Sequence, residues 1–163
     1  GLVGYIGAAS TGTQLSGNVL IEGCTISAKL TSNYTTAKGP AYGPMGGVIG
    51  LICRAQETNV TIKDTVFDGS VDGHYSIGGV VGNFIPQSGQ TGKVVIEETV
   101  DASGAKLNAA GHAAATRVGG LFTLCNDCSY VEVKDGAKFT GAAYSVGTTN
   151  AKLYNADGTE YTK

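Results

Sequence analysis

The 163 residues contain no tryptophan, only three prolines and few charged side chains, which make up 15% of the chain. An ordinary globular domain is about one-quarter charged. The eleven lysines and arginines are scattered, and thirteen acidic residues outweigh them for a net charge of -2. A nucleic-acid surface needs a clustered basic stripe, and a membrane-spanning helix needs roughly 20 consecutive apolar residues. Neither pattern occurs, so we expect neither nucleic acid as a partner nor a membrane span.

Glycine, by contrast, is abundant, with 26 residues. The glycines follow no three-residue period, which excludes a collagen triple helix. Valine, isoleucine and leucine recur in ordered blocks, which excludes a disordered chain. The composition indicates many short strands joined by tight corners, in a chain whose length suits one domain with a continuous core.

A glycine-rich block recurs along the chain. Gly-Gly-Val-Ile-Gly at 46–50 returns as Gly-Gly-Val-Val-Gly at 78–82 and as Gly-Gly-Leu-Phe at 119–122. Residues 1–4 match the same pattern without its first glycine, so the chain is expected to begin inside a repeat, as a fragment or a processed product. Gly147 is expected to start a degenerate last copy.

Two strand-like blocks follow each glycine block. The first has the period-2 pattern of a strand with one buried face, and its copies are residues 18–22, 59–63, 93–97 and 130–134. The second is looser, and its copies are residues 25–27, 66–68, 99–101 and 138–140. Three strands per repeat predict an all-β fold, a right-handed parallel β-helix of about four rungs. We expect the β-helix in residues 1–147 and a degenerate repeat or cap in 148–163, where Asp157-Gly158 is typical of a hairpin turn.

Stacked repeats would place equivalent residues in columns along the axis, where β-branched side chains pack well. The predicted inward columns are Val19-Val60-Val94-Val131, Ile21-Ile62-Ile96-Val133 and Ile26-Phe67-Val100-Phe139. The outward position after the second column reads Glu22, Lys63, Glu97 and Lys134. Neighbouring rungs would therefore pair opposite charges, which favours one register.

The paired glycines are predicted to form sharp corners, because glycine tolerates a positive φ and close backbone approach. A phosphate-binding role is disfavoured. No Gly-Lys-Ser/Thr ends the block, and no helical pattern follows it.

The Gly-Gly-Val-Val-Gly copies, followed by a strand such as Asn-Val-Thr-Ile-Lys-Asp at 59–64, resemble the GLUG-type repeat of bacterial surface and secreted proteins. They resemble, more distantly, the repeats of polymorphic outer-membrane proteins. The resemblance covers roughly residues 1–147, although the copy at 119–122 lacks the closing glycine. It implies a β-helix in a large cell-envelope protein, often an adhesin or a stalk, and it supplies no catalytic residue.

Four cysteines, Cys24, Cys53, Cys125 and Cys128, allow three full disulfide pairings in a secreted chain. Cys24 with Cys53 is the more plausible long-range pair. Cys125 and Cys128 form a Cys-x-x-Cys that suits a redox pair, half of a zinc site, or a local disulfide or two small core residues. The last reading is favoured, because the helix of a redox motif is missing. A zinc site would need two more ligands from Cys53, His74 and His112.

Some β-helices are polysaccharide lyases or glycosidases, whose sites cluster carboxylates. Asp64, Glu98 and Asp135 are expected to form an acidic column after the first strand block, suited to calcium or to a carboxylate pair. Aspartate is equally common in turns for conformational reasons. A glycan-binding loop face would carry Tyr34, Tyr42 and Tyr75.

Two glycosylation sequons occur, at Asn33-Tyr34-Thr35 and Asn59-Val60-Thr61. Asn33 is expected in a loop and accessible. Asn59 is expected to open a strand and to be less accessible.

These patterns predict a non-catalytic structural or adhesive module of an extracellular or cell-surface protein, with no cofactor and no metal. The expected partners are other copies or repeats, or surface glycans and proteins. Because the ends of such a stack expose strand edges, end-to-end assembly into filaments is also expected. The alternative is a carbohydrate-active β-helix enzyme or a glycan-binding module.

Overall fold

The computed structural model describes residues 1–8, 15–32, 43–109, 117–124, 126, 128–147 and 151–162. Asn33, Tyr34, Tyr42, His112 and Cys125 lie outside the described residues, so the predictions made for them stay predictions. Every helix or strand assigned within these ranges is a β-strand, and the chain is all-β there. Accordingly, none of the described residues forms a helix able to cross a membrane.

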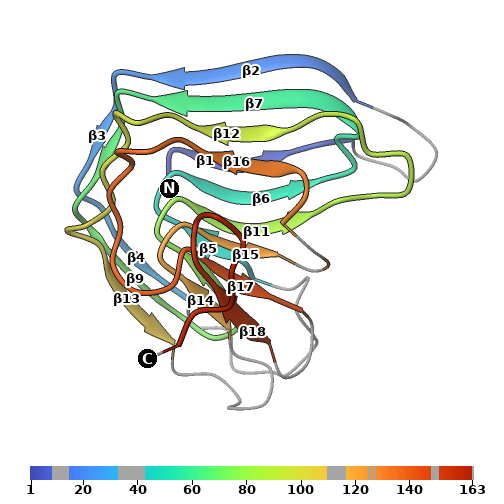
Figure 1. Cartoon of the computed structure of the whole chain (residues 1–163). Helices are drawn as coiled ribbons and strands as arrows, with labels where there is room; N and C mark the ends of the chain where they lie inside the picture. The colour runs from blue at the N-terminus through green and yellow to red at the C-terminus, as the bar shows by residue number, and fades with distance from the viewer. Residues whose placement is uncertain are drawn as a thin grey trace.

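The strands form five sheets, which we call A to E, and Figure 1 shows how they wrap around the molecule. Sheet A contains β1 (Val3–Ile6), β6 (Ile49–Cys53), β11 (Val81–Ile85), β15 (Phe122–Leu124), β17 (Tyr144–Val146) and β18 (Lys152–Tyr154). Sheet B contains β2 (Ser16–Glu22), β7 (Glu57–Lys63), β12 (Val94–Ile96) and β16 (Val131–Val133). Sheet C contains β3 (Thr25–Ile26) and β8 (Val66–Phe67). Sheet D contains β4 (Lys29–Thr31), β9 (Ser70–Gly73) and β13 (Lys106–Ala109). Sheet E contains β5 (Met45–Gly46), β10 (Ser76–Gly78) and β14 (Arg117–Gly119).

The chain visits the sheets in the order A, B, C, D, E and then returns to A. Repeat 1 is β1–β5, repeat 2 is β6–β10, repeat 3 is β11–β14, and repeat 4 begins with β15 and β16. Each strand pairs in parallel with its counterpart in the neighbouring repeat, as in β2–β7–β12–β16. A full repeat therefore has five strands, and the prediction of three strands per rung was wrong. The strands of sheets D and E have only two to four residues, too few to show a period-2 pattern.

The first two predicted columns are confirmed by the register of sheet B. Val60 pairs with Val19 and Val94, and Val94 pairs with Val131. Ile62 likewise lies between Ile21 and Ile96, which pairs with Val133. Val60, Ile62 and Ile96 are fully buried, whereas the outermost members of the columns are more exposed. These columns form the centre of the apolar core.

The third predicted column was wrong in one member. Val66 bridges to Asp101, and Asp101 bridges to Lys138, so Phe67 lies level with Ala102 rather than with Val100. Repeat 3 has one residue more than repeat 2 between sheet B and sheet C, and a turn with a Val100 N to Glu97 O hydrogen bond of 3.1 Å accommodates it. Val100 is nevertheless buried, at 1% exposure.

The glycine pairs form the corner between sheets E and A, as predicted, but not through a positive φ. A Cβ on Gly46 would lie 2.0 Å from Ile49 O, and one on Gly78 would lie 1.9 Å from Val81 O. Neither glycine has a positive φ. Close approach of backbone to backbone is therefore the reason for glycine at this corner.

The last copy of the glycine block is not at Gly147, as predicted, but at residues 141–146. Phe122 pairs with Tyr144, which sets Ala142 and Ala143 opposite Gly120 and Leu121. β18 then adds to β17 in the antiparallel sense and ends sheet A. The expected hairpin around Asp157-Gly158 is present, with a hydrogen bond of 2.8 Å from Asn155 N to Thr159 O.

Candidate functional site

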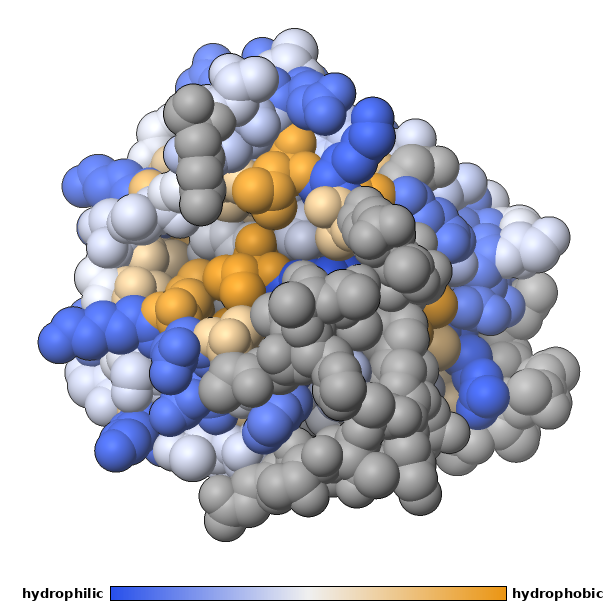
Figure 2. All heavy atoms as spheres, turned by 90° about the horizontal axis from the view of Figure 1, so that it is seen from below, coloured by the Kyte–Doolittle hydropathy of each residue, from blue (hydrophilic) through white to orange (hydrophobic). Residues whose placement is uncertain are grey.

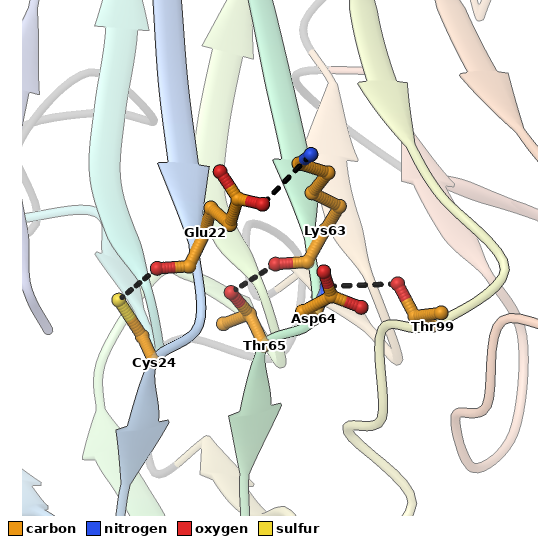
Figure 3. A network of polar contacts seen from close by, with 6 residues as sticks. All are labelled: Glu22, Cys24, Lys63, Asp64, Thr65 and Thr99. Carbon is orange, nitrogen blue, oxygen red and sulfur yellow. Dashed lines mark hydrogen bonds and ion pairs between the residues drawn. The ribbon is translucent and has the colours of Figure 1, made fainter.

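The corner between sheets B and C carries a ladder of polar contacts between repeats (Figure 3). Lys63 Nζ lies 2.8 Å from Glu22 Oε1, which is the predicted pairing of opposite charges in repeats 1 and 2. This hydrogen bond raises the pKa of Lys63 above its ordinary value. Lys134 instead contacts Glu132 on its own strand, so the predicted alternation is formed at one end of the column only. Both pairs are exposed and add little stability, and only the Lys63–Glu22 pair, which joins two repeats, favours one register.

Asp64 belongs to the predicted acidic column, and its backbone explains why an aspartate is found there. Its φ is 45°, a left-handed conformation, and the equivalent position in repeat 1 is Gly23 with φ 67°. Asp64 N donates to Thr99 Oγ1 at 2.8 Å across to repeat 3. Aspartate tolerates this conformation better than most residues do. The conformational role of aspartate is thus supported at this position.

A cluster of ligands for calcium or zinc is not found in the part of the chain that the structure describes. No three side chains of histidine, cysteine, aspartate or glutamate converge there. Glu98 and Asp135 are exposed at turns, and Tyr75, which was expected on a glycan-binding face, is only 3% exposed. Tyr75 cannot offer its ring to a glycan, so that part of the prediction was wrong.

Two of the four cysteines, Cys24 and Cys128, are free thiols. Cys24 follows the end of β2, and its Sγ donates to Glu22 O at 3.4 Å. Cys53 precedes the start of β7, which runs beside β2 in parallel, so the two cysteines lie at opposite ends of this strand pair. Seven residues of strand span about 20 Å, whereas a disulfide needs Cα atoms within about 7 Å. The geometry therefore disfavours the expected Cys24–Cys53 bridge within one chain.

Asn59, the described sequon asparagine, lies inside β7 rather than at its start. Its Nδ2 donates to Asn18 Oδ1 at 3.2 Å, and its Oδ1 accepts from Lys93 N at 3.2 Å. The amide thus links repeats 1, 2 and 3. This ladder gives Asn59 a structural role, and its glycosylation stays a prediction.

Arg117 is the largest fully buried side chain of the described residues, a feature that the sequence did not reveal. One guanidinium nitrogen donates to Gly147 O at 2.7 Å and to Leu124 O at 3.2 Å, and the other contacts Ser76 Oγ. The side chain therefore ties sheet E to the two strands β15 and β17 of sheet A.

We expect Arg117→Met to lower the free energy of unfolding by about 2 kcal/mol, because the part-buried Gly147 O would lose its guanidinium donor and the buried Leu124 O would keep only Gly147 N. Arg117→Lys is expected to recover only part of this, since an ammonium group lacks the planar fork of the guanidinium. Urea unfolding followed by circular dichroism measures both. Equal stability of all three proteins would contradict the proposed tie.

Tyr144 anchors the C-terminal hairpin to the core. Its hydroxyl donates to Ala156 O at 3.1 Å, and its ring packs on that of Phe122 with centroids 6.1 Å apart. Burial raises the pKa of Tyr144 well above the ordinary tyrosine value of 10.0. The folded state therefore keeps the proton in a pH range where the unfolded state releases it.

The free energy of unfolding is accordingly expected to fall as the pH rises above about 10, because the unfolded chain then binds fewer protons than the folded one. Tyr144→Phe should lose about 1 kcal/mol at pH 7 through the missing hydrogen bond. It should also show a shallower decline between pH 10 and pH 11. Urea unfolding measures the free energy of unfolding of both proteins at each pH. An equally steep fall between pH 10 and pH 11 in the two proteins would refute this role for Tyr144.

A hollow of about 390 Å³ opens beside the last strands of sheets D and E. Leu107, Val118, Ala142, Leu153 and Tyr161 are among its lining residues. Figure 2, which shows the molecule from below, has apolar surface near its centre, bordered above and on the left by hydrophilic residues. The hollow was not predicted. The sequence did contain a signal for it, the length of one segment. Four residues separate Phe139 from Tyr144, whereas nineteen separate the equivalent Ala102 from Phe122, and these nineteen include β13 and β14.

Comparison with known proteins finds no matching family model, no matching curated protein and no matching solved structure. The resemblance to GLUG-type repeats therefore stays a prediction.

Proposed function

We propose that this chain is a non-catalytic structural or adhesive β-helix module of an extracellular or cell-surface protein. The observation that carries the proposal is the parallel stacking of β2, β7, β12 and β16, with equivalent residues in register. The return of the chain through sheets A to E in repeats 1 and 2 supports a solenoid path, for which the proposed hand is right-handed.

The distribution of side chains also supports a structural role. The recurring blocks of the sequence form buried columns, tight glycine corners and ladders between repeats, such as Asn18–Asn59. The carboxylates Asp64, Glu98 and Asp135 are spread along an exposed corner. No observation on the described residues favours the lyase or glycosidase alternative over this role.

Surface location is tested with antibodies raised against the 163-residue chain. They should label intact cells of the source organism, or detect the protein in its medium, without permeabilisation. Labelling that appears only after permeabilisation would refute the proposed location.

Absence of catalysis is tested by incubating the purified chain with acidic and neutral polysaccharides. We expect no rise in the absorbance of unsaturated uronates and no new reducing ends. Turnover that copurifies with the chain and is lost in Asp64→Asn or Glu98→Gln would overturn the proposal in favour of the enzyme.

A further inference from the structure

At the end of the stack where the C-terminal hairpin lies, the five sheets do not all end at the same repeat, and we call this end stepped. Repeat 4 contributes β16 to sheet B and an Asp101–Lys138 bridge next to sheet C. It then passes directly through residues 140–143 to β17. Sheets D and E therefore end at β13 and β14 in the described residues, one repeat before sheets A and B end. We call the space left by these two missing strands the repeat-4 recess.

The side chains that line the recess are mostly apolar and come from three parts of the chain. β13 supplies Leu107 and β14 supplies Val118, both half-buried, while Ala142 lies on the direct connection of repeat 4. Leu153 and Tyr161 of the hairpin form the outer wall. Within the described residues the outer edge of β13 pairs with no further strand, and Leu107 of this strand lines the hollow. An unpaired strand edge pairs readily with another strand.

The step decides what fits the recess. A second copy stacked end to end would bring the strands of its repeat 1 in sheets A to E forward together. Its β2 would meet β16, and its β1 would meet the β17–β18 hairpin, before its β4 reached β13. A single extended segment meets neither obstacle. The recess is therefore shaped for one added strand rather than for a whole copy of the chain.

We propose that the repeat-4 recess binds an extended segment of a partner polypeptide, which adds a strand to β13. The columns of sheet D define the chemistry of that segment. Leu107 continues an apolar column through Val71 and Leu30, so an apolar side chain is required beside it. Its neighbours along the strand are the exposed Lys106 and Asn108, which favour polar or acidic residues on both sides of that apolar side chain. This inference depends on the stepped end alone and holds whether or not the proposed surface role is correct.

A synthetic peptide of residues 69–78 of this chain, Gly-Ser-Val-Asp-Gly-His-Tyr-Ser-Ile-Gly, is the probe. It contains β9, which pairs with β13 inside the chain and places Val71 beside Leu107 and Asp72 beside Asn108. With a fluorophore on its N-terminus, it should bind the full chain with a Kd of about 100 µM or tighter, measured by anisotropy. The amide signals of Lys106–Ala109 in a nitrogen–proton correlation spectrum should shift on binding.

Leu107→Lys should weaken peptide binding about tenfold or more, since the ammonium group would enter the apolar contact. The matched control is Leu20→Lys, on an exposed leucine of β2 in sheet B, which should bind as the wild type does. A peptide with aspartate in place of Val71 should not bind. Thermal unfolding verifies that both variants fold, and the map of amide shifts on the wild type remains decisive if Leu107→Lys does not.

The proposal is overturned by absence of binding at millimolar peptide, or by amide shifts confined to other sheets. It is also overturned if the chain associates with itself as its concentration rises and Leu107→Lys abolishes that association, because the occupant would then be a second copy. Light scattering after size-exclusion chromatography detects this outcome.

Discussion

Ile62→Asp is expected to abolish cooperative folding of the chain. Ile62 is 0% exposed and lies between Ile21 and Ile96 in the second column of sheet B. A carboxylate there would be buried among isoleucines without a partner for its charge. We expect a loss of about 4 kcal/mol or more, which is most of the stability of an ordinary domain.

Two further variants separate the effect of a buried charge from the effects of an exposed charge and of a small apolar substitution. Leu20→Asp places the same charge at a position that is 56% exposed on the neighbouring strand β2, and it should change stability by no more than about 0.5 kcal/mol. Ile62→Val removes one methyl group and should cost about 1 kcal/mol. Urea unfolding followed by circular dichroism ranks the three. A folded Ile62→Asp with the wild-type midpoint would show that the column is not buried.

The columns of sheet B could be predicted from the sequence because its two seven-residue strands, β2 and β7, are long enough to alternate. In β7 every second residue from Thr58 to Ile62 is buried, so the pattern reports the inward face directly. The third column could not be aligned in the same way, because its register depends on the length of a turn. The one extra residue before Asp101 shifts the alignment without changing the hydrophobic pattern around Val100.

The recess and the buried arginine lay beyond sequence reasoning for a different reason. The recess depends on which repeat lacks strands, whereas a search for patterns aligns what is present in each repeat. The burial of Arg117 depends on how neighbouring strands pack. Arg117 stands two positions before the glycine block, where repeat 2 has Ser76, and only the packing of β14 against β15 shows that its guanidinium is enclosed. Segment length was the usable signal, since the short passage from Phe139 to Tyr144 leaves no room for two strands.

The glycine corners give the second large effect, and the repeat depends on them. Between Gly78 and Val81 the chain reverses from sheet E into sheet A, and the missing side chain lets the backbone of Gly78 lie against Val81 O. A Cβ added to Gly78 would also lie 2.8 Å from Leu121 O of the next repeat. Both neighbours are backbone atoms held by the sheets, so neither can move aside without breaking ladder hydrogen bonds.

Gly78→Ala is therefore expected to lower the free energy of unfolding by about 3 kcal/mol or more, although it adds a single methyl group. Gly4→Ala is the matched control, because a Cβ on Gly4 of β1 would meet no atom within 4 Å. Gly4 also lacks a positive φ, so its replacement should be neutral to within about 0.5 kcal/mol. Thermal and urea unfolding of the two variants side by side measure the difference. Equal midpoints would mean that the chain does not turn this corner by close backbone contact, and the stacking of repeats 2 and 3 through Gly78 would have to be abandoned.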